Sequence, residues 1–393
     1  MLDSFFRTHQ YLVEHMQPVL RRALMDEIDW KARLIGIKGS RGVGKTTFLL
    51  QYASENFGAQ DHRCLYINMN NFYFQGKTLF QFACEYQQAG GQVLLIDQVF
   101  KHPDWSRELR AIYDHCTRLR VVFTGSSVMR LKEENPELNG IVASYNLRGF
   151  SFREFLNLTL GLNLRTYGLR EIQNRHERIS REVMEQVNPL EYFQAYVHHG
   201  YYPFFLENTN FSENLLKVMN MMIEVDILLI KQIELKYLSR IKKLLYLVAT
   251  DESGAPNVTQ LAAETQTSRA TVMNYIKYLS DARLINMVYR QDEDFPKKPS
   301  LLLLHNPNLM YAMMPGRVDK QTMLETFFQN ALWGRHDVRM GDRSSTFIVD
   351  NTQRFRICSE IPRRKNTDVI YALSDITEGE GQEIPLWMYG FLY

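Results

Sequence analysis

Cysteine is scarce in this chain, with four residues among 393, and none lies in a CxxC pair or a tight cluster with histidine. That spacing argues against a structural zinc site and a disulfide framework, and favours a reducing, cytoplasmic setting. Long apolar runs are also missing, because charges interrupt every stretch before it reaches the roughly 18 apolar residues that span a bilayer. We therefore expect a soluble protein with no membrane partner.

An excess of charge of one sign is absent too, since 46 Lys and Arg residues face 44 Asp and Glu residues, a formal net charge of +2. Any contact with nucleic acid must then come from a local patch rather than from the field of the whole protein. The composition is otherwise globular, with 45% apolar and 23% charged side chains. A chain of this length has room for about two or three domains, each with its own core.

A glycine-rich segment is the most informative feature. RLIGIK at 33–38 predicts a strand, GSRGVGKT a loop, and TTFLLQYASENF a helix. Glycines let backbone N–H groups turn toward phosphate oxygens, and the following helix presents its positive end to the same anion. We expect this loop to bind ATP through Gly39, Ser40, Arg41, Gly42, Val43, Gly44, Lys45, Thr46 and Thr47.

Two residues of this loop are expected to carry its chemistry. Lys45 would reach the β- and γ-phosphates as a catalytic residue. The hydroxyl of Thr46 would bind Mg²⁺, because Mg²⁺ prefers hard oxygen ligands and usually keeps several waters. A chance glycine-rich turn is the alternative, but the strand before the loop and the helix after it both disfavour that interpretation.

Three more apolar runs follow: CLYINMN at 64–70, QVLLID at 92–97 and LRVVFTGSS at 119–127. Such runs, alternating with helical segments, predict strands buried on both faces of a parallel sheet. Asp97 ends the second run, so we expect it beside the loop, holding Mg²⁺ through a bound water. Thr124 and Ser126 end the third run and are candidate sensors of the γ-phosphate. The alternative is that their hydroxyls satisfy local backbone groups.

Gln98 follows Asp97, at a position where many P-loop ATPases with an extra strand carry a glutamate that deprotonates the attacking water. An amide orients water but cannot accept its proton, and general-base assistance contributes about 10²–10⁴ in rate. We include Gln98 in the catalytic set and expect slow hydrolysis or ATP binding alone. Asp104 and Glu108 are nearby carboxylates, but their segment predicts an amphipathic helix with its charges in solvent.

Taken in order, these motifs resemble a family of prokaryotic AAA-type P-loop ATPases, in which a winged helix and a restriction-endonuclease-like domain follow the ATP-binding domain. The resemblance rests on GSRGVGKTTFLLQYA, LLIDQVFKHPDW, VVFTGSSVMRL, LRGFSFREFL at 147–156, HHGYYPFFLE at 198–207 and IEVD at 223–226. It implies an α/β fold: an AAA-type parallel sheet, a helical and winged-helix region, and a small α/β endonuclease-like domain. The expected boundaries are 1–159 for the ATP-binding domain, 160–241 for a helical connector or lid, 242–298 for the winged helix-turn-helix and 299–393 for the last domain.

The chain departs from this family at two places. Asp97-Gln98 replaces the usual Asp-Glu pair, and NGIVASYNLRGF replaces the usual glycine-arginine pair before SFREFL. Candidates for the trans-acting or sensing arginine are therefore Arg130, Arg148 and Arg153. The alternative for each of them is a surface or inter-domain ion pair.

The segment from Pro256 to Arg290 predicts a helix-turn-helix followed by a strand, with Ser268 as the N-cap of the second helix. That helix should bury a stripe of Val272, Ile276 and Leu279. Its outward residues, Arg269, Thr271, Asn274 and Lys277, are candidates for contact with double-stranded DNA. Because the helix carries little net positive charge, a role as scaffold or as the site of a protein partner is the alternative.

The last segment alternates in the manner of strands behind a helix. In family terms, Glu325 and Asp350 match two acidic positions of an endonuclease-like site. Arg356 and Cys358 stand where a further acid and a lysine are needed to hold Mg²⁺, so cleavage is not expected.

Our first hypothesis is thus a Mg²⁺ and ATP-operated switch with weak ATPase activity. The second is a DNA-binding regulatory or defence protein that ATP gates through the winged helix. A nuclease is the third.

Overall fold

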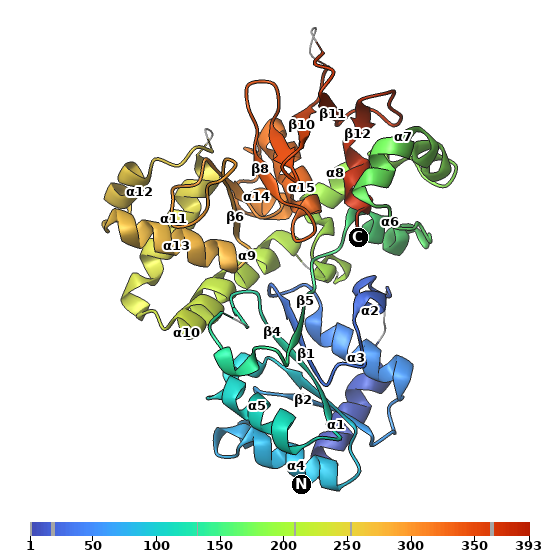
Figure 1. Ribbon diagram of the computed structural model, residues 1–393, viewed down its shortest axis with the longest axis vertical. Helices are drawn as coiled ribbons and strands as arrows, with labels where there is room; N and C mark the ends of the chain where they lie inside the picture. Colours follow the sequence, from blue (N-terminus) through green and yellow to red (C-terminus); the bar gives the residue numbers. More distant parts are fainter. Residues whose placement is uncertain (1, 17–19, 132, 208–209, 252–253, 362–364) are drawn as a thin grey trace. The chain divides into compact units, whose positions relative to one another are not determined.

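The computed structural model describes residues 2–16, 20–131, 133–207, 210–251, 254–361 and 365–393. Backbone contacts divide the chain into two units, Met1–Arg148 and Gly149–Tyr393 (Figure 1). The expected end of the ATP-binding domain, residue 159, falls within α6 (Phe152–Leu160), which these contacts assign to the second unit. The segments expected at 160–241, 242–298 and 299–393 all lie in that second unit.

A five-stranded, fully parallel sheet with the order β2-β3-β4-β1-β5 forms the centre of the first unit. Its strands are β1 (Leu34–Gly39), β2 (Cys64–Asn68), β3 (Val93–Asp97), β4 (Arg120–Ser126) and β5 (Ala143–Asn146). The four apolar runs of the sequence correspond to β1 to β4, so this prediction is confirmed. We did not predict β5, because its residues alternate between half-buried and exposed positions and form no continuous apolar run.

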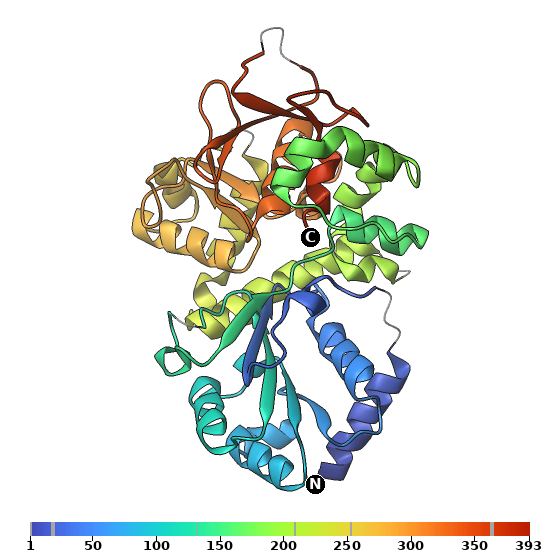
Figure 2. The same cartoon turned by 45° about the vertical axis from the view of Figure 1, so that its right-hand side comes forward.

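Helices cover both faces of this sheet because parallel strands need long crossover connections. The helices are α1 (Leu2–His15), α2 (Leu24–Glu27), α3 (Lys45–Asn56), α4 (Leu79–Gln88) and α5 (Trp105–His115), with 3₁₀ turns at Phe72–Gln75, Val99–Lys101 and Pro136–Leu138. Figure 2 shows α1 and α3 on one face and α4 and α5 on the other. The expected amphipathic helix is α5, which buries Leu109 and Ile112.

The second unit begins with helices, as the sequence predicts. They are α6, α7 (Leu169–Met184), α8 (Pro189–Ala195), α9 (Phe211–Met221), α10 (Leu228–Lys231) and α11 (Leu238–Thr250). Two π-helical turns, Tyr196–Gly200 and Met222–Ile227, and two 3₁₀ turns, Pro203–Leu206 and Leu235–Tyr237, interrupt them. The Asn308 side chain donates to the carbonyls of Tyr196 and Val197 at 3.0 and 2.8 Å, which satisfies acceptors in the first π-turn.

Two short helices and a hairpin follow: α12 (Val258–Glu264), α13 (Arg269–Asp281), and the antiparallel pair β6 (Ile285–Val288) and β7 (Leu301–Leu304). The Ser268 hydroxyl accepts from the Thr271 N–H at 3.1 Å, so the predicted N-cap is confirmed. The predicted inward stripe is also confirmed, because Val272, Ile276 and Leu279 are fully buried.

A mixed sheet of order β12-β11-β10-β9-β8 ends the chain. Its strands are β8 (Val338–Met340), β9 (Phe347–Val349), β10 (Gln353–Cys358), β11 (Val369–Leu373) and β12 (Glu383–Pro385). The pairs β8–β9 and β9–β10 are antiparallel, whereas β10–β11 and β11–β12 are parallel. Two helices, α14 (Pro307–Met313) and α15 (Lys320–Leu332), precede this sheet, and the 3₁₀ turn Leu386–Phe391 follows it.

The two acidic residues that match family positions in this last region make different contacts. Glu325 accepts from Gln321, whose amide also donates to the carbonyl of Ile357 near the end of β10. Asp350 lies in the turn before β10, where it accepts from the Asp337 N–H and lies 2.8 Å from the His336 ring. The two carboxylates thus have different hydrogen-bond partners, and the match of these positions to an endonuclease-like site stays a prediction.

Helix α1 protects the exposed edge of the first sheet. Strand β2 lies at that edge, and the backbone N–H of Tyr66 donates to Nδ1 of His9 at 3.0 Å. His9 is buried, with 1% of its surface exposed. Burial, with a smaller effect from nearby His62, lowers the pKa of His9 from 6.5 to about 4.

We predict a loss of stability in acid that depends on His9. Between pH 6.5 and 4 the unfolded chain binds a proton that folded His9 does not, so the free energy of unfolding falls as pH falls, by up to about 3 kcal/mol. Urea unfolding at several pH values, with hydrogen exchange at the Tyr66 amide, measures this loss. His9→Gln should flatten the dependence in this window, and His15→Gln, at an exposed position of the same helix, should not. Identical pH profiles for native protein and His9→Gln would rule the effect out.

Candidate nucleotide site

The loop after β1 has the backbone that a phosphate cradle needs. Gly42 and Gly44 adopt φ values of 84° and 92°, in the left-handed region that favours glycine. A Cβ atom on Gly39 would lie 2.5 Å from the carbonyl oxygen of Leu147, so only glycine fits there. Gly44 is the N-cap of α3, and the side chain of Val43, in the same loop, is fully buried. The loop therefore ends at a helix N-terminus, where backbone N–H groups are available to an anion.

Two cations hold this loop. Lys45 is the first residue of α3, and its ammonium group donates to the carbonyls of Gly39 and Ser40 at 2.9 and 2.8 Å. Arg22 is buried and donates to the carbonyls of Val43, at 3.3 Å, and Arg148, at 2.8 Å. We did not predict the contribution of Arg22, because nothing in its local sequence indicates that it lies against the loop.

Asp97 lies at the carboxyl end of β3, beside the loop, with 1% of its surface exposed. Its Oδ2 atom accepts hydrogen bonds from the Thr46 hydroxyl at 2.7 Å, the Tyr66 hydroxyl at 2.9 Å and the Asn68 amide at 3.3 Å. The Thr124 hydroxyl donates to the other carboxylate oxygen. Residues from α3, β2 and β4 thus converge on one carboxylate of β3.

Tyr66 and Asn68 are members of this cluster that the sequence analysis missed. Burial, and to a smaller extent the charge of Asp97, raise the pKa of Tyr66, so its phenol keeps the proton that it donates. The strand register brings these groups together, because Asn68 pairs with Asp97 across β2 and β3. The sequence shows polar residues in CLYINMN, but it does not indicate that Tyr66 and Asn68 contact Asp97.

Gln98 lies directly beside this cluster in an uncommon backbone conformation, with φ of 56°. Its N–H donates to the Thr124 hydroxyl at 2.9 Å, and its side chain is half-buried. The two nearby carboxylates have other partners. Asp104 is exposed and lies 3.7 Å from Arg107, whereas Glu108 accepts from the Phe80 N–H at 2.9 Å and lies 3.1 Å from the His102 ring.

The other candidates occupy varied environments. Thr124 uses its hydroxyl for Asp97 and the Gln98 N–H, and Ser126 accepts from the Val128 N–H at 3.3 Å; their role as sensors stays a prediction. Arg153 remains a candidate only by sequence. It is buried in the second unit, where its guanidinium donates to the carbonyls of Leu164 and Tyr393. Arg130 lies 3.9 Å from Glu134.

The oxygen donors of this site fit Mg²⁺. Thr46 and Asp97 offer a hydroxyl and a carboxylate within hydrogen-bond distance of each other, and a Mg²⁺ ion bound with a nucleotide needs only one or two such protein groups. Within the described ranges no cluster of three or more His, Cys, Asp and Glu residues could hold a metal ion.

The candidate DNA-contact residues on α13 differ in exposure. Arg269 and Asn274 are exposed. The hydroxyl of Thr271 lies 2.9 Å from that of Ser268, within the helix cap, and the ammonium group of Lys277 lies 3.1 Å from Asp281. The polar face available to a ligand is therefore smaller than the sequence suggests.

Comparisons with known proteins agree with this geometry. Residues 31–156 match the AAA domain family, and residues 190–301 match a domain family of unknown function, DUF8612. An uncharacterised protein of Methanocaldococcus jannaschii is 26% identical over 273 residues, which are 66% of this chain and 57% of that protein. The chain thus spans little more than half the length of this curated relative.

Solved structures show weaker similarity. A variant of RuvB from Thermotoga maritima aligns over 73% of this chain and 90% of its own, with 14% identity and a TM-score of 0.27. The Orc1 protein of Aeropyrum pernix, solved in complex with DNA, aligns over 79% and 91%, with 10% identity and a TM-score of 0.30. Scores this low carry no conclusion about this chain. No helix in the described parts of the chain is long and apolar enough to cross a membrane. The family match and the strand order together identify the first unit as an AAA-type P-loop NTPase domain.

Proposed function

We propose that this protein is a switch operated by ATP and Mg²⁺ that hydrolyses ATP slowly. The observation that carries the proposal is the cluster around Asp97. The Thr46 hydroxyl donates to the Asp97 carboxylate, whereas Gln98, the residue after Asp97, offers no base. Binding groups are thus assembled, but the usual proton acceptor is missing from its place.

Binding rests on the loop from Gly39 to Thr47. Its left-handed glycines and the start of α3 present N–H groups to phosphate oxygens, and Lys45 would turn from the loop carbonyls to the β- and γ-phosphates. Thr46 and Asp97 would hold Mg²⁺, the Asp97 carboxylate through a water. The bound metal would neutralise charge on the phosphates.

Slow hydrolysis follows from the side chains around the site. Gln98 can orient a water through its amide, but it cannot take the proton that the water must lose. Asp104 has an exposed carboxylate next to Arg107, and Glu108 anchors the start of α4 through the Phe80 N–H. A side chain already held in a structural contact is a poor substitute for a base at position 98.

We predict that Gln98→Glu accelerates hydrolysis. The substitution keeps side-chain length and adds a proton acceptor, so the single-turnover rate with Mg²⁺ should rise by about 10²-fold or more. Gln98→Asn is the matched control, because Asn retains the amide and tolerates the left-handed backbone. Radiolabelled ATP under single-turnover conditions gives the rates. Brisk turnover by the native chain would show that another group activates the water.

Lys45→Ala should abolish tight nucleotide binding, because it removes the ammonium group that pairs with the phosphates. Equilibrium titration with a fluorescent ATP analogue measures this loss. Lys77→Ala, at an exposed position outside the loop, should bind like the native chain. Equal affinity of Lys45→Ala and native protein would place the nucleotide elsewhere.

A second candidate function is DNA binding that ATP gates through a winged helix. Three helices, α11 to α13, followed by the β6–β7 hairpin give the element order of such a module, and Arg269 and Asn274 are exposed on α13. In this candidate the mixed last sheet, with α15, would serve binding or shape rather than cleavage, because Arg356 and Cys358 stand where a nuclease needs a further acid and a lysine.

A duplex-binding assay tests this second candidate. The protein should bind a DNA duplex at low salt. Added salt should weaken this binding, and the variant Arg269→Ala/Lys277→Ala should lose it. Absence of any shift at low salt would remove this function. Plasmid that stays intact with Mg²⁺ or Mn²⁺ would exclude a nuclease.

A further inference from the structure

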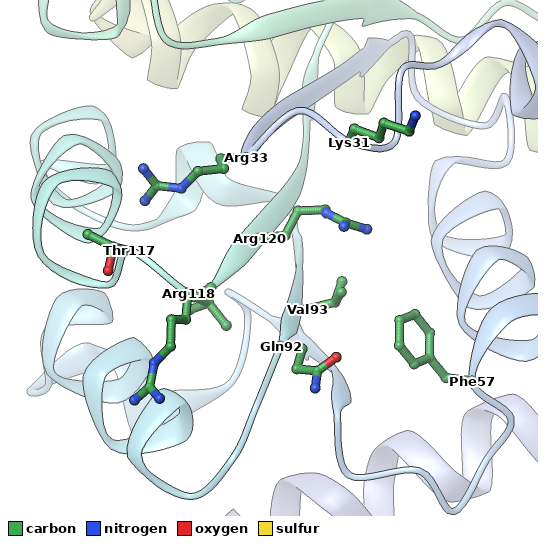
Figure 3. Close-up of a pocket in the computed structure, with 9 residues that line it drawn as sticks. Lys31, Arg33, Phe57, Gln92, Val93, Thr117, Arg118 and Arg120 are labelled. Atoms are coloured by element: carbon green, nitrogen blue, oxygen red, sulfur yellow. The ribbon is translucent and has the colours of Figure 1, made fainter.

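The amino-terminal edge of the first sheet carries a second pocket, of about 220 Å³ (Figure 3). The segments that precede β1, β3 and β4 line it, together with Phe57 at the end of α3. The nucleotide site lies at the carboxyl ends of the same strands. Strands of this length separate the two edges by roughly 20 Å, so the pocket is not part of the nucleotide site.

Four cationic side chains surround this pocket: Lys31, Arg33, Arg118 and Arg120. The lining contains no acidic residue. Among the described residues, no ion pair joins any of the four to a carboxylate. Like charges repel one another when they are gathered without counter-charges, so an anionic ligand would relieve an unfavourable arrangement.

Asp29, two residues before Lys31, accepts from the Lys31 backbone N–H at 3.0 Å. Three other acidic residues near these segments in the sequence have basic partners outside the pocket lining. Glu55 lies 3.1 Å from Arg21. Asp61 lies 2.6 Å from Arg63, and Asp114 lies 2.8 Å from Arg110. These three carboxylates are therefore engaged by cations outside the pocket, and Asp29 is the acidic residue that contacts the pocket segments.

Two of the arginines are held in place before any ligand arrives. The Arg33 guanidinium donates to the carbonyl of Tyr113 at 2.6 Å and lies 4.2 Å from the centre of the Tyr113 ring. The Nε atom of Arg33 is buried and has no hydrogen-bond partner. Arg120 donates to the Tyr52 hydroxyl at 3.3 Å. Lys31 and Arg118 are exposed at the rim. Because Arg33 and Arg120 are already held, less side-chain entropy would be lost when they bind a ligand.

The cations are arranged on two sides of the pocket. In Figure 3 Arg33 and Arg118 extend to one side, Arg120 and Lys31 extend to the other, and Gln92 lies between them. A single small anion contacts one side, whereas a chain of phosphates crosses both. Phe57 adds an aromatic ring to the lining, and aromatic rings bind unpaired bases by stacking.

We propose that this pocket binds single-stranded nucleic acid, with the four cations on successive phosphates and Phe57 against a base. The cationic strip supplies affinity without sequence preference, because phosphates are the same in every sequence. Gln92 and the Thr117 hydroxyl can hydrogen-bond the sugar or base edges. This site is separate from the proposed ATP switch and from the candidate winged helix.

Fluorescence anisotropy of the full chain with a short labelled oligodeoxythymidylate tests the proposal. Lys31→Ala/Arg118→Ala changes two exposed side chains, so the fold should persist, and unaltered ATP binding verifies this. Loss of two phosphate contacts should weaken binding roughly tenfold near 0.1 M salt and make the salt dependence shallower. Lys77→Ala/Arg107→Ala removes equal charge from exposed positions of the same unit and should bind like the native chain.

Three further measurements distinguish binding at this pocket from binding at α13 and from non-specific binding of polyanions. Arg269→Ala/Asn274→Ala should leave single-strand binding unchanged, since it alters only α13. Phe57→Leu should weaken binding without changing the salt slope, because it removes stacking and no charge. Absence of binding at low salt, equal weakening by the two double variants, or equal competition by polyglutamate would overturn the proposal. Loss of binding in the α13 variant alone would also overturn it.

Discussion

The buried carboxylate of Asp97 is the interaction on which the organisation of the first unit depends. A carboxylate taken out of water is strongly unfavourable unless donors replace its hydration. Here the donors are Thr46, Tyr66, Asn68 and Thr124. Satisfying one charge therefore fixes the start of α3, the end of β2 and the end of β4 relative to β3. The phosphate loop is held between β1 and α3, so its position depends on the same group.

In the proposed switch, this constraint would allow binding and hydrolysis to be separated. The groups that would hold the phosphates and the metal are locked by the fold around Asp97. The position at which many P-loop ATPases carry a proton-accepting glutamate lies one residue later, at Gln98, where the chain turns into the left-handed region. A change at position 98 alters the chemistry of one side chain without disturbing the carboxylate. The same fold would therefore accommodate either a slow or a fast ATPase, depending on the side chain at position 98.

Sequence reasoning predicted the parts of this unit that local pattern determines. Apolar runs predicted β1 to β4, and the glycine spacing predicted the loop and the start of α3. Strand β5 escaped because its residues alternate in burial and pair only with β1. Tyr66 and Asn68 escaped because their contact with Asp97 depends on the register of β2 against β3.

The same limit applied to the second unit. The cap at Ser268 and the buried stripe of α13 are local features, and both were predicted. Arg153 lies near the expected end of the ATP-binding domain in the sequence, but its contacts are with Leu164 and Tyr393. Glu325 and Asp350 matched two positions of a family pattern, which did not indicate their contacts with Gln321 and with the Asp337 N–H. Distances between remote segments are set by topology, which single motifs do not contain.

Local pairing of charge, rather than net charge, decides where a polyanion would bind. On the winged-helix candidate, Lys277 lies 3.1 Å from Asp281, and Lys243 lies 3.3 Å from Glu264. A phosphate must compete with those carboxylates. At the amino-terminal edge of the first sheet the cations have no such competitor within the described chain, and Arg33 and Arg120 are already oriented by Tyr113 and Tyr52. Under the proposal, phosphates would therefore meet fewer paired cations at this pocket than on α13, although α13 is the more familiar nucleic-acid element in the sequence.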